Sequence, residues 1–279
     1  MSALDPRIHP FRPEIAASHL RGQVDAARFV GGARYEIVEP TADLRRAPSP
    51  EAWLDTQALF GERVTVYEST EEGRAWGQLE GDGYVGWLPM RALGPLGPAP
   101  THKVTALRTL AFPSADIKAP PAAALPMGAM LTVARHDERF AVAASGWHIP
   151  RSHLVSLTSK QPDFVAVAER FLGTPYLWGG KTALGLDCSA LVQVALQAAG
   201  VPCPRDSDMQ ERELGKPSSL SELRRGDLVF WKGHVAIARD GATLVHANAH
   251  HMAVAVEPVP EALARIAAAG SEVSSVKRL

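Results

Sequence analysis

Residues 173–192 read GTPYLWGGKTALGLDCSALV, and the cysteine in this stretch decides how the chain is interpreted. Cys188 follows a glycine-rich loop and precedes an apolar pattern with helical spacing. The pattern predicts a helix that ends near Gly200 and holds Cys188 in its first turn. Exposed backbone N–H groups and the helix dipole favour a thiolate over a thiol there. We therefore expect a nucleophile at Cys188, although a free cysteine can also serve only as a buried apolar residue.

Two histidines lie downstream in strand-like runs. His234 opens the run HVAIA, and His246 lies inside the run LVHA. A base for the thiol must come within hydrogen-bond distance of it, and a third polar group can hold that base in the correct tautomer. The order Cys, His, His thus predicts His234 as the base and His246 as the group that orients it. Either histidine alone would fit a purely structural role equally well.

A metal site is the alternative for part of this set. His246, His250 and His251 could combine with Cys203, but residues 247–252 look like a turn between strands. Neither Cys-x-x-Cys nor His-Glu-x-x-His occurs in the sequence. We expect no metal and no cofactor.

Charge and composition exclude several classes of protein. The chain has 279 residues with 29 basic and 30 acidic side chains, so nothing favours nucleic acid or an anionic membrane as a partner. Two cysteines are too few for a disulfide scaffold. No stretch approaches the ~20 apolar residues that span a bilayer, and no apolar run follows a basic start as in a secretory signal. We expect a cytoplasmic monomer that binds neither nucleic acid nor membrane.

The first half of the chain predicts an arm and two β modules. Residues 1–30 contain a short helical pattern over Glu14–Phe29, and from about Tyr35 the period changes to two. Residues 94–100, GPLGPAP, predict a linker. Three segments then recur in order, which favours two duplicated all-β modules at 31–94 and 101–158 over chance similarity: LRRAPS and LRTLAFPS, GERVTV and GAMLTV, and GW before proline at residues 86 and 146.

The second half, residues 161–279, predicts helices followed by strands. A helix is expected from Pro162 to Leu172, before the helix at Cys188. Because the helices come first and the strands afterwards, this region is α+β rather than α/β. The expected strands are Asp227–Trp231, His234–Ala238, Thr243–Ala247 and Ala253–Val259.

The loop PRDS at 204–207 connects these helices to the strands. The guanidinium of Arg205 could hold a substrate carboxylate through its fork of donors. Asp206 could meet an ammonium group. A solvated loop with a turn-forming Asp-Ser is the simpler alternative.

Taken together, these motifs resemble the NlpC/P60 family of cell-wall cysteine peptidases. The resemblance runs from Pro162 to the C-terminus and implies a papain-like α+β fold. The two β modules resemble bacterial SH3-like (SH3b) domains, so the expected architecture is an α+β NlpC/P60 catalytic domain preceded by two small SH3-like β-barrels. The matching elements are GTPYLWGG at 173–180, DCS at 187–189, PRDS at 204–207, RGDLVF at 225–230, GHVAI at 233–237 and HA at 246–247.

This combination of domains is similar to γ-D-glutamyl-L-diamino-acid endopeptidases. The resemblance implies cleavage between D-Glu and the diamino acid of murein stem peptides that carry a free N-terminal L-Ala, in cell-wall peptide recycling. It assigns Cys188, His234 and His246 the roles given above and places Tyr176 beside the oxyanion. The implied substrate contacts are Asp187, Ser189, Arg205, Asp206, Ser207 and Trp178, with Glu62 and Tyr84 of the first module completing the amine pocket.

One position departs from the family pattern, because Ala190 follows Ser189 where Ser-Gly is usual. This change leaves the nucleophile intact. Two alternatives to the peptidase remain: a module that binds wall peptides with an inactive catalytic domain, and an NlpC/P60-type amidase or acyltransferase. Enzymes of the latter type usually lack SH3b domains and carry an apolar tail, whereas this chain ends in SEVSSVKRL.

Overall fold

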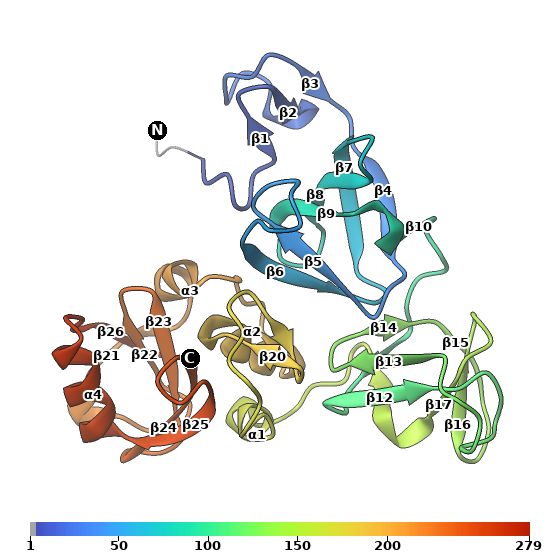
Figure 1. The fold of residues 1–279 in the computed structure, drawn as a ribbon. Helices are drawn as coiled ribbons and strands as arrows, with labels where there is room; N and C mark the ends of the chain where they lie inside the picture. Colours follow the sequence, from blue (N-terminus) through green and yellow to red (C-terminus); the bar gives the residue numbers. More distant parts are fainter. Residues whose placement is uncertain (1–3) are drawn as a thin grey trace. The chain divides into compact units, whose positions relative to one another are not determined.

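The computed structural model describes residues 4–279, which divide into two compact units (Figure 1). The first unit ends at Leu157 and the second begins at Thr158. None of the helices among the described residues combines the length and the apolar character needed to span a bilayer.

The first unit begins with an arm of short strands rather than the helix expected over Glu14–Phe29, so that prediction is wrong. The three consecutive residues from Ile15 to Ala17 are all fully buried, whereas a surface helix would bury only one stripe. Ile15 packs with Trp76 and Trp87. This packing overrides the weak helical pattern. The arm consists of β1 (Phe11–Arg12), β2 (Ile15–Ala17), a 3₁₀ turn (Ser18–Leu20) and β3 (Phe29–Val30).

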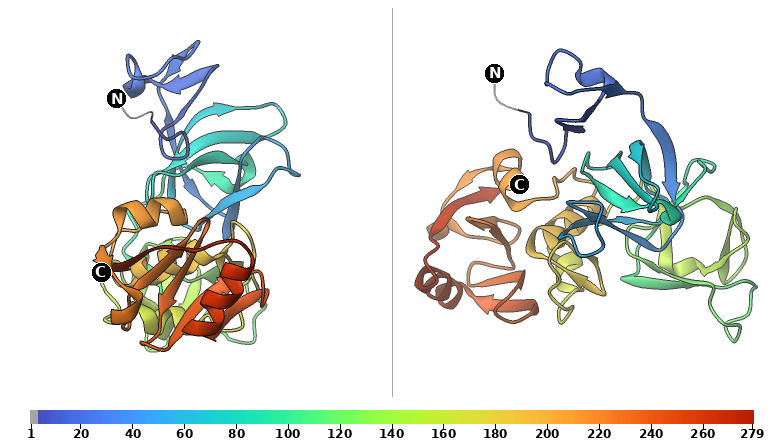
Figure 2. Two further views of the ribbon diagram at one scale, coloured as in Figure 1. Left: turned by 90° about the vertical axis from the view of Figure 1, so that its left-hand side faces the viewer. Right: turned by 45° about the horizontal axis from the view of Figure 1, so that its top comes forward.

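Arg12 fastens this arm to the first β module. Its guanidinium carbon lies 4.4 Å from the centre of the Trp76 ring and 4.8 Å from that of the Trp87 ring. Glu68 forms ion pairs with both Arg12 and Arg28, so one carboxylate joins two parts of the arm to the module. Both views in Figure 2 show the arm against this module.

The first module is a seven-stranded antiparallel sheet in the order β10-β4-β7-β8-β9-β5-β6. A core of small and branched side chains, with Leu44, Val64 and Leu88 among them, fills its interior. The strands are β4 (Ala33–Ile37), β5 (Thr41–Arg45), β6 (Leu54–Leu59), β7 (Arg63–Ser69), β8 (Arg74–Leu79), β9 (Val85–Pro89) and β10 (Leu93–Gly94).

The second module has three small antiparallel sheets around its own core, which includes Leu125, Leu131 and Ile149. The sheets are β14-β11-β18, β12-β13 and β15-β16-β17. Their strands are β11 (His102–Val104), β12 (Arg108–Ala111), β13 (Ala123–Pro126), β14 (Met130–Leu131), β15 (Val133–His136), β16 (Phe140–Ala143), β17 (His148–Pro150) and β18 (Leu154–Ser156).

The two modules end in the same local pattern. In each, a strand ending in proline leads into a 3₁₀ turn and then a short strand: β9, Met90–Ala92 and β10 in the first module, and β17, Arg151–His153 and β18 in the second. The modules also contact each other directly. The N–H of Met130 donates to the carbonyl of Phe60, and a Cβ at Gly61 would lie 2.1 Å from the Met130 carbonyl oxygen, so this approach needs glycine.

The second unit packs helices against one six-stranded antiparallel sheet, as the α+β expectation requires. Helix α2 (Cys188–Ala198) packs on α1 (Phe164–Glu169) and on the central strands β23 and β24. Gly200 has a φ of +76° just after the end of α2, as expected for a glycine that terminates a helix. The sheet order is β21 (Lys216–Ser218), β26 (Val273–Arg278), β22 (Leu228–Trp231), β23 (His234–Ala238), β24 (Thr243–Asn248) and β25 (Ala253–Pro258).

The four predicted strands of this sheet agree with the structure within one residue at each end. Other elements differ from expectation. Helix α1 is shorter than predicted, because Asp163 caps it by accepting the N–H groups of Val165 and Ala166 and it ends at Glu169. The sequence interpretation also missed α3 (Ser207–Glu213) and α4 (Val259–Ala268), and the edge strand β21 with its neighbour β26.

The stacking of Arg12 generates a test of the arm. We expect Arg12→Met to lower the free energy of unfolding of the first unit by about 1–3 kcal/mol, because it removes two ring contacts and an ion pair. Chemical denaturation followed by tryptophan fluorescence measures this change. Arg91→Met is the control: Arg91 pairs with Glu39 but its side chain is 77% exposed, so we expect a change within about 0.5 kcal/mol. Equal losses in the two variants would contradict the proposed role of Arg12.

Candidate active site

Cys188 is the first residue of α2, and the residue before it caps the helix. The Asp187 carboxylate accepts the backbone N–H groups of Ala190 at 2.9 Å and of Gly179 at 2.8 Å. One oxygen therefore satisfies the helix end while the other holds the preceding glycine loop. The cysteine is fixed at the helix N-terminus by this cap, as the sequence pattern predicted.

Arg205 completes the same network from the loop before α3. It donates to both Asp187 oxygens at 2.9 and 2.7 Å, to the Ser189 hydroxyl at 2.8 Å and to the Gly180 carbonyl at 3.3 Å. The Ser189 hydroxyl also donates to Asp187. Only 1% of Arg205 is exposed. These three predicted substrate contacts therefore bind one another, and the fork of Arg205 that was expected to hold a substrate carboxylate is engaged with Asp187.

The sulfur of Cys188 lies among backbone donors but is buried. The N–H groups of Val235 and Ser189 donate to it, which by itself favours the thiolate. Burial outweighs them, and together with the charge of Asp187 it raises the pKa of the Cys188 thiol to about 12. The expectation of a resting thiolate is thus wrong for the ligand-free protein. The position at a helix N-terminus favours the thiolate, but desolvation of the sulfur has the larger effect on its pKa.

The two histidines are joined to each other. His234 Nε2 lies 2.9 Å from His246 Nδ1, with the ring centroids 5.2 Å apart. Strand β23 pairs with β24 only at Ile237 and Ala238. The first residues of β23 are therefore not paired with β24, and the two imidazole rings lie between the strands there. The N–H of Val235, the residue after His234, reaches the Cys188 sulfur. The structure therefore brings the start of β23 to both the thiol and His246.

Burial keeps both imidazoles neutral. It is the main cause that lowers the pKa of His234 to about 3, with His246 adding to it. Burial likewise lowers the pKa of His246 to about 4, against the opposing charge of Glu257. The resting site is therefore a neutral thiol beside two neutral imidazoles rather than an ion pair.

Two further residues extend the histidine pair, and the sequence interpretation missed both. Glu257 on β25 lies 3.0 Å from His246 Nε2, and Arg265 on α4 donates to both Glu257 oxygens at 2.8 and 2.7 Å. Arg265 is the main cause that lowers the pKa of Glu257 to about 2. A signal existed: Glu257 is the one acidic residue in the otherwise apolar run AVAVEP, and PEALARIAAAG after it has helical spacing.

Tyr176 lies beside the nucleophile. Its backbone bridges to Leu186, two residues before Cys188, and its N–H donates to the Met252 carbonyl. Burial, then the charges of Cys188 and Asp187, raise the pKa of its phenol, so the hydroxyl remains a hydrogen-bond donor.

The remaining predicted residues lie at different places. Trp178 is 58% exposed in the loop before Cys188. Asp206 and Ser207 are partly buried at the start of α3. Glu62 and Tyr84 belong to the first unit, where Glu62 accepts the N–H of Leu59 and Tyr84 is 4% exposed. A role for these five in substrate binding stays a prediction.

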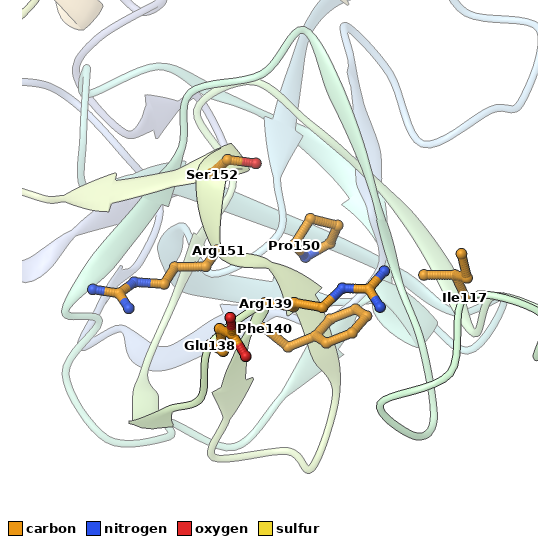
Figure 3. A pocket seen from close by; sticks show the side chains of 7 residues that line it. All are labelled: Ile117, Glu138, Arg139, Phe140, Pro150, Arg151 and Ser152. Atoms are coloured by element: carbon orange, nitrogen blue, oxygen red, sulfur yellow. The ribbon is translucent and has the colours of Figure 1, made fainter.

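The described residues were expected to hold no metal, and a separate hollow lies away from Cys188 in sequence. Within residues 4–279, no group of three or more His, Cys, Asp or Glu side chains is arranged to hold a metal ion. A hollow of about 660 Å³ lies in the second module (Figure 3). None of the predicted site residues lines it; its lining is Ile117, Glu138, Arg139, Phe140, Pro150, Arg151 and Ser152.

Comparison with known proteins identifies two domains in the chain. A family model described as the NlpC/P60 family matches residues 173–266, and one described as a bacterial dipeptidyl-peptidase SH3 domain matches residues 44–93. The chain contains an NlpC/P60 domain. The catalytic unit is accordingly a cysteine peptidase domain of this family, preceded by an SH3-like domain.

Individual relatives extend the similarity beyond the NlpC/P60 domain. The chain is homologous to a gamma-D-glutamyl-L-lysine dipeptidyl-peptidase of Bacillus subtilis, with 28% identity over 74% of this chain and 76% of that protein. Dipeptidyl-peptidase 6 of Lysinibacillus sphaericus is 35% identical over 37% of this chain, and that match spans 39% of the relative. The crystal structure of an NlpC/P60 family protein from Bacillus cereus shares the fold, with a TM-score of 0.74, 20% identity and coverage of 88% of this chain and 99% of that one.

The buried thiol of the NlpC/P60 domain predicts slow alkylation. At pH 7 we expect iodoacetamide to modify Cys188 more than about tenfold slower than it modifies glutathione, with the rate rising toward high pH as the thiolate forms. Mass spectrometry of peptides from the Cys203→Ala protein measures the rate at Cys188. Alkylation at pH 7 as fast as that of a free thiol would show that the pair rests as thiolate and imidazolium.

The neutral histidines predict a second pH effect. Because folding lowers the pKa values of His234 and His246, the unfolded chain binds more protons below about pH 6.5, and stability is lost as the pH falls from there. We expect the ring signals of both residues in nuclear magnetic resonance spectra to remain those of neutral imidazole at pH 5. The same residues in the urea-unfolded chain should titrate near pH 6.5. Titration near 6.5 in the folded protein would contradict the burial argument.

Proposed function

We propose that this protein is a cysteine endopeptidase that hydrolyses the bond between γ-D-Glu and the diamino acid of murein stem peptides with a free N-terminal L-Ala. The observation that carries the proposal is the position of Cys188 at a helix N-terminus, where its sulfur accepts the N–H of Val235, the neighbour of a His234 that is hydrogen-bonded to His246. The similarity to a gamma-D-glutamyl-L-lysine dipeptidyl-peptidase supports the choice of substrate.

The reaction follows from the neutral resting state. As the Cys188 sulfur attacks the γ-carbonyl carbon of D-Glu, its proton passes to His234, so charge appears only when the bond forms. His246 and the carboxylate behind it stabilise the imidazolium. His234 then gives the proton to the amine of the leaving diamino acid, and the C–N bond breaks. Water, deprotonated by His234, hydrolyses the thioester and regenerates the thiol.

The developing oxyanion has donors in the vicinity of the sulfur. The backbone N–H of Cys188 lies at the start of α2, where no helical partner accepts it. The Tyr176 phenol is protonated throughout the working pH range and can donate a second hydrogen bond. A donor of this kind contributes about 3–4 kcal/mol to transition-state stabilisation.

Substrate selection is the second part of the proposal. Asp206, at the partly buried start of α3, would bind the ammonium group of L-Ala, which exists only in a stem peptide already freed from the sugar. The preference for free peptides would suit an enzyme that recycles wall fragments in the cytoplasm. We also propose that the second β module is an SH3b domain, because it ends in the same strand, 3₁₀ turn and strand as the first.

Mass spectrometry of digestion products tests the activity and the substrate together. The wild-type protein is incubated with L-Ala-γ-D-Glu-L-Lys, with the corresponding diaminopimelate peptide and with intact sacculi. We expect release of the free diamino acid from one or both peptides and none from sacculi. Cys188→Ala should lose this release entirely, because no other described group replaces the nucleophile.

Other outcomes would redirect the assignment. Release of diamino acid by Cys188→Ala would disprove the mechanism. Cleavage of sacculi as efficient as that of the free peptides would show that no free amine is required, and would favour a role in wall remodelling. Binding of the peptides without turnover by the wild-type protein would favour a wall-peptide binding module.

A further inference from the structure

We propose that Glu257, held by Arg265, is a positioning residue that sets the tautomers of both active-site histidines and so leaves Nδ1 of His234 unprotonated as the catalytic base. The proposal rests on the proposed function for its catalytic part. Its structural part concerns the ligand-free protein and stands on hydrogen-bond geometry.

The hydrogen bond between Glu257 and His246 can run in one direction only. Arg265 donates to both oxygens of this carboxylate, so it stays ionised and can only accept. Glu257 Oε2 lies 3.0 Å from His246 Nε2. Nε2 of His246 must therefore carry the proton.

The protonation of His246 in turn determines which nitrogen of His234 carries the proton. Because His246 is neutral and protonated at Nε2, its Nδ1 is a bare acceptor. His234 Nε2 lies 2.9 Å from it and must donate. The neutral His234 then has its lone pair on Nδ1. One carboxylate thus determines the hydrogen positions on both rings.

The surroundings leave few competing partners. His246 is fully buried and Glu257 is 6% exposed, so water does not take over either bond. The charged or titratable groups that act on His246 are Glu257, Arg265 and His251, and those that act on His234 are His246, Arg265 and Glu257. Among these groups Glu257 is the only anion.

The chemistry gives Glu257 a second effect during catalysis. When His234 takes the thiol proton, the positive charge lies one imidazole away from the carboxylate, which stabilises it. Removing the negative charge also lowers the proton affinity of the pair. A variant without the charge should lose kcat with little change in KM, because the effect arises only after the substrate is bound.

Two variants separate the charge from the tautomer. In Glu257→Gln the side-chain oxygen can still accept from His246, so the tautomers should persist while kcat falls at least about tenfold. In Glu257→Ala no acceptor remains, so both rings should become tautomer mixtures. Long-range ¹H–¹⁵N spectra of the ligand-free proteins report which ring nitrogens carry protons. We expect both wild-type rings to be protonated at Nε2 only.

Glu169→Gln is the matched control. Glu169 is also a carboxylate held by arginines, Arg225 and Arg239, in the same unit but at its surface. We expect wild-type kcat and wild-type tautomers in this variant. A loss equal to that of Glu257→Gln would mean that the effect is general destabilisation, and would overturn the proposal.

The readouts keep the two proposals separate. If the wild-type protein releases no diamino acid, the proposed function fails, and the nitrogen spectra alone decide whether Glu257 sets the tautomers. If the wild type is active but Glu257→Gln keeps its full kcat, the catalytic part is overturned. If Glu257→Ala retains wild-type tautomers, the positioning role is overturned. If Glu257→Ala does not fold, the wild-type protein still tests the positioning role. Wild-type rings that carry the proton at Nδ1 would overturn it.

Discussion

The structure of the catalytic unit depends on the hydrogen bonds and the ion pair of the Asp187 carboxylate. It caps α2, accepts the N–H of Gly179 and pairs with the buried guanidinium of Arg205. The helix end, the glycine loop and the segment before α3 are thus joined at one side chain. Taking one partner away would leave the other charge buried without compensation, a loss of about 3–5 kcal/mol. Asp187 and Arg205, which were predicted to contact the substrate, thereby fix the position of the nucleophile.

A second carboxylate acts at the opposite end of the site. Glu257 is joined to Arg265 as Asp187 is joined to Arg205, and each acid–guanidinium pair fixes one reacting group. The first pair positions the sulfur and the second orients the imidazoles. Both carboxylates are largely removed from water, which defines the geometry of their hydrogen bonds. The reacting groups between them carry no charge until substrate arrives.

The sequence predicted much of this arrangement and missed parts of it for physical reasons. Cys188 at a helix start, the terminating Gly200 and the four strands β22 to β25 followed from local periodicity and from glycine. Glu257 stands out locally as an acid in an apolar run, but its pairing with His246, eleven residues away on the neighbouring strand, has no local signal. The thiolate expectation failed because helix position is a local property whereas desolvation depends on the whole fold. The arm at Ile15 was mistaken for a helix because its contacts with Trp76 lie far along the chain.

The buried, protonated sulfur has a consequence for survival of the protein under oxidative conditions. Peroxides attack thiolates and largely spare thiols. A cysteine that loses its proton only as it attacks a bound carbonyl therefore presents little to oxidants between turnovers. The same desolvation that removes the resting anion would spare Cys188 from irreversible conversion to sulfinic acid.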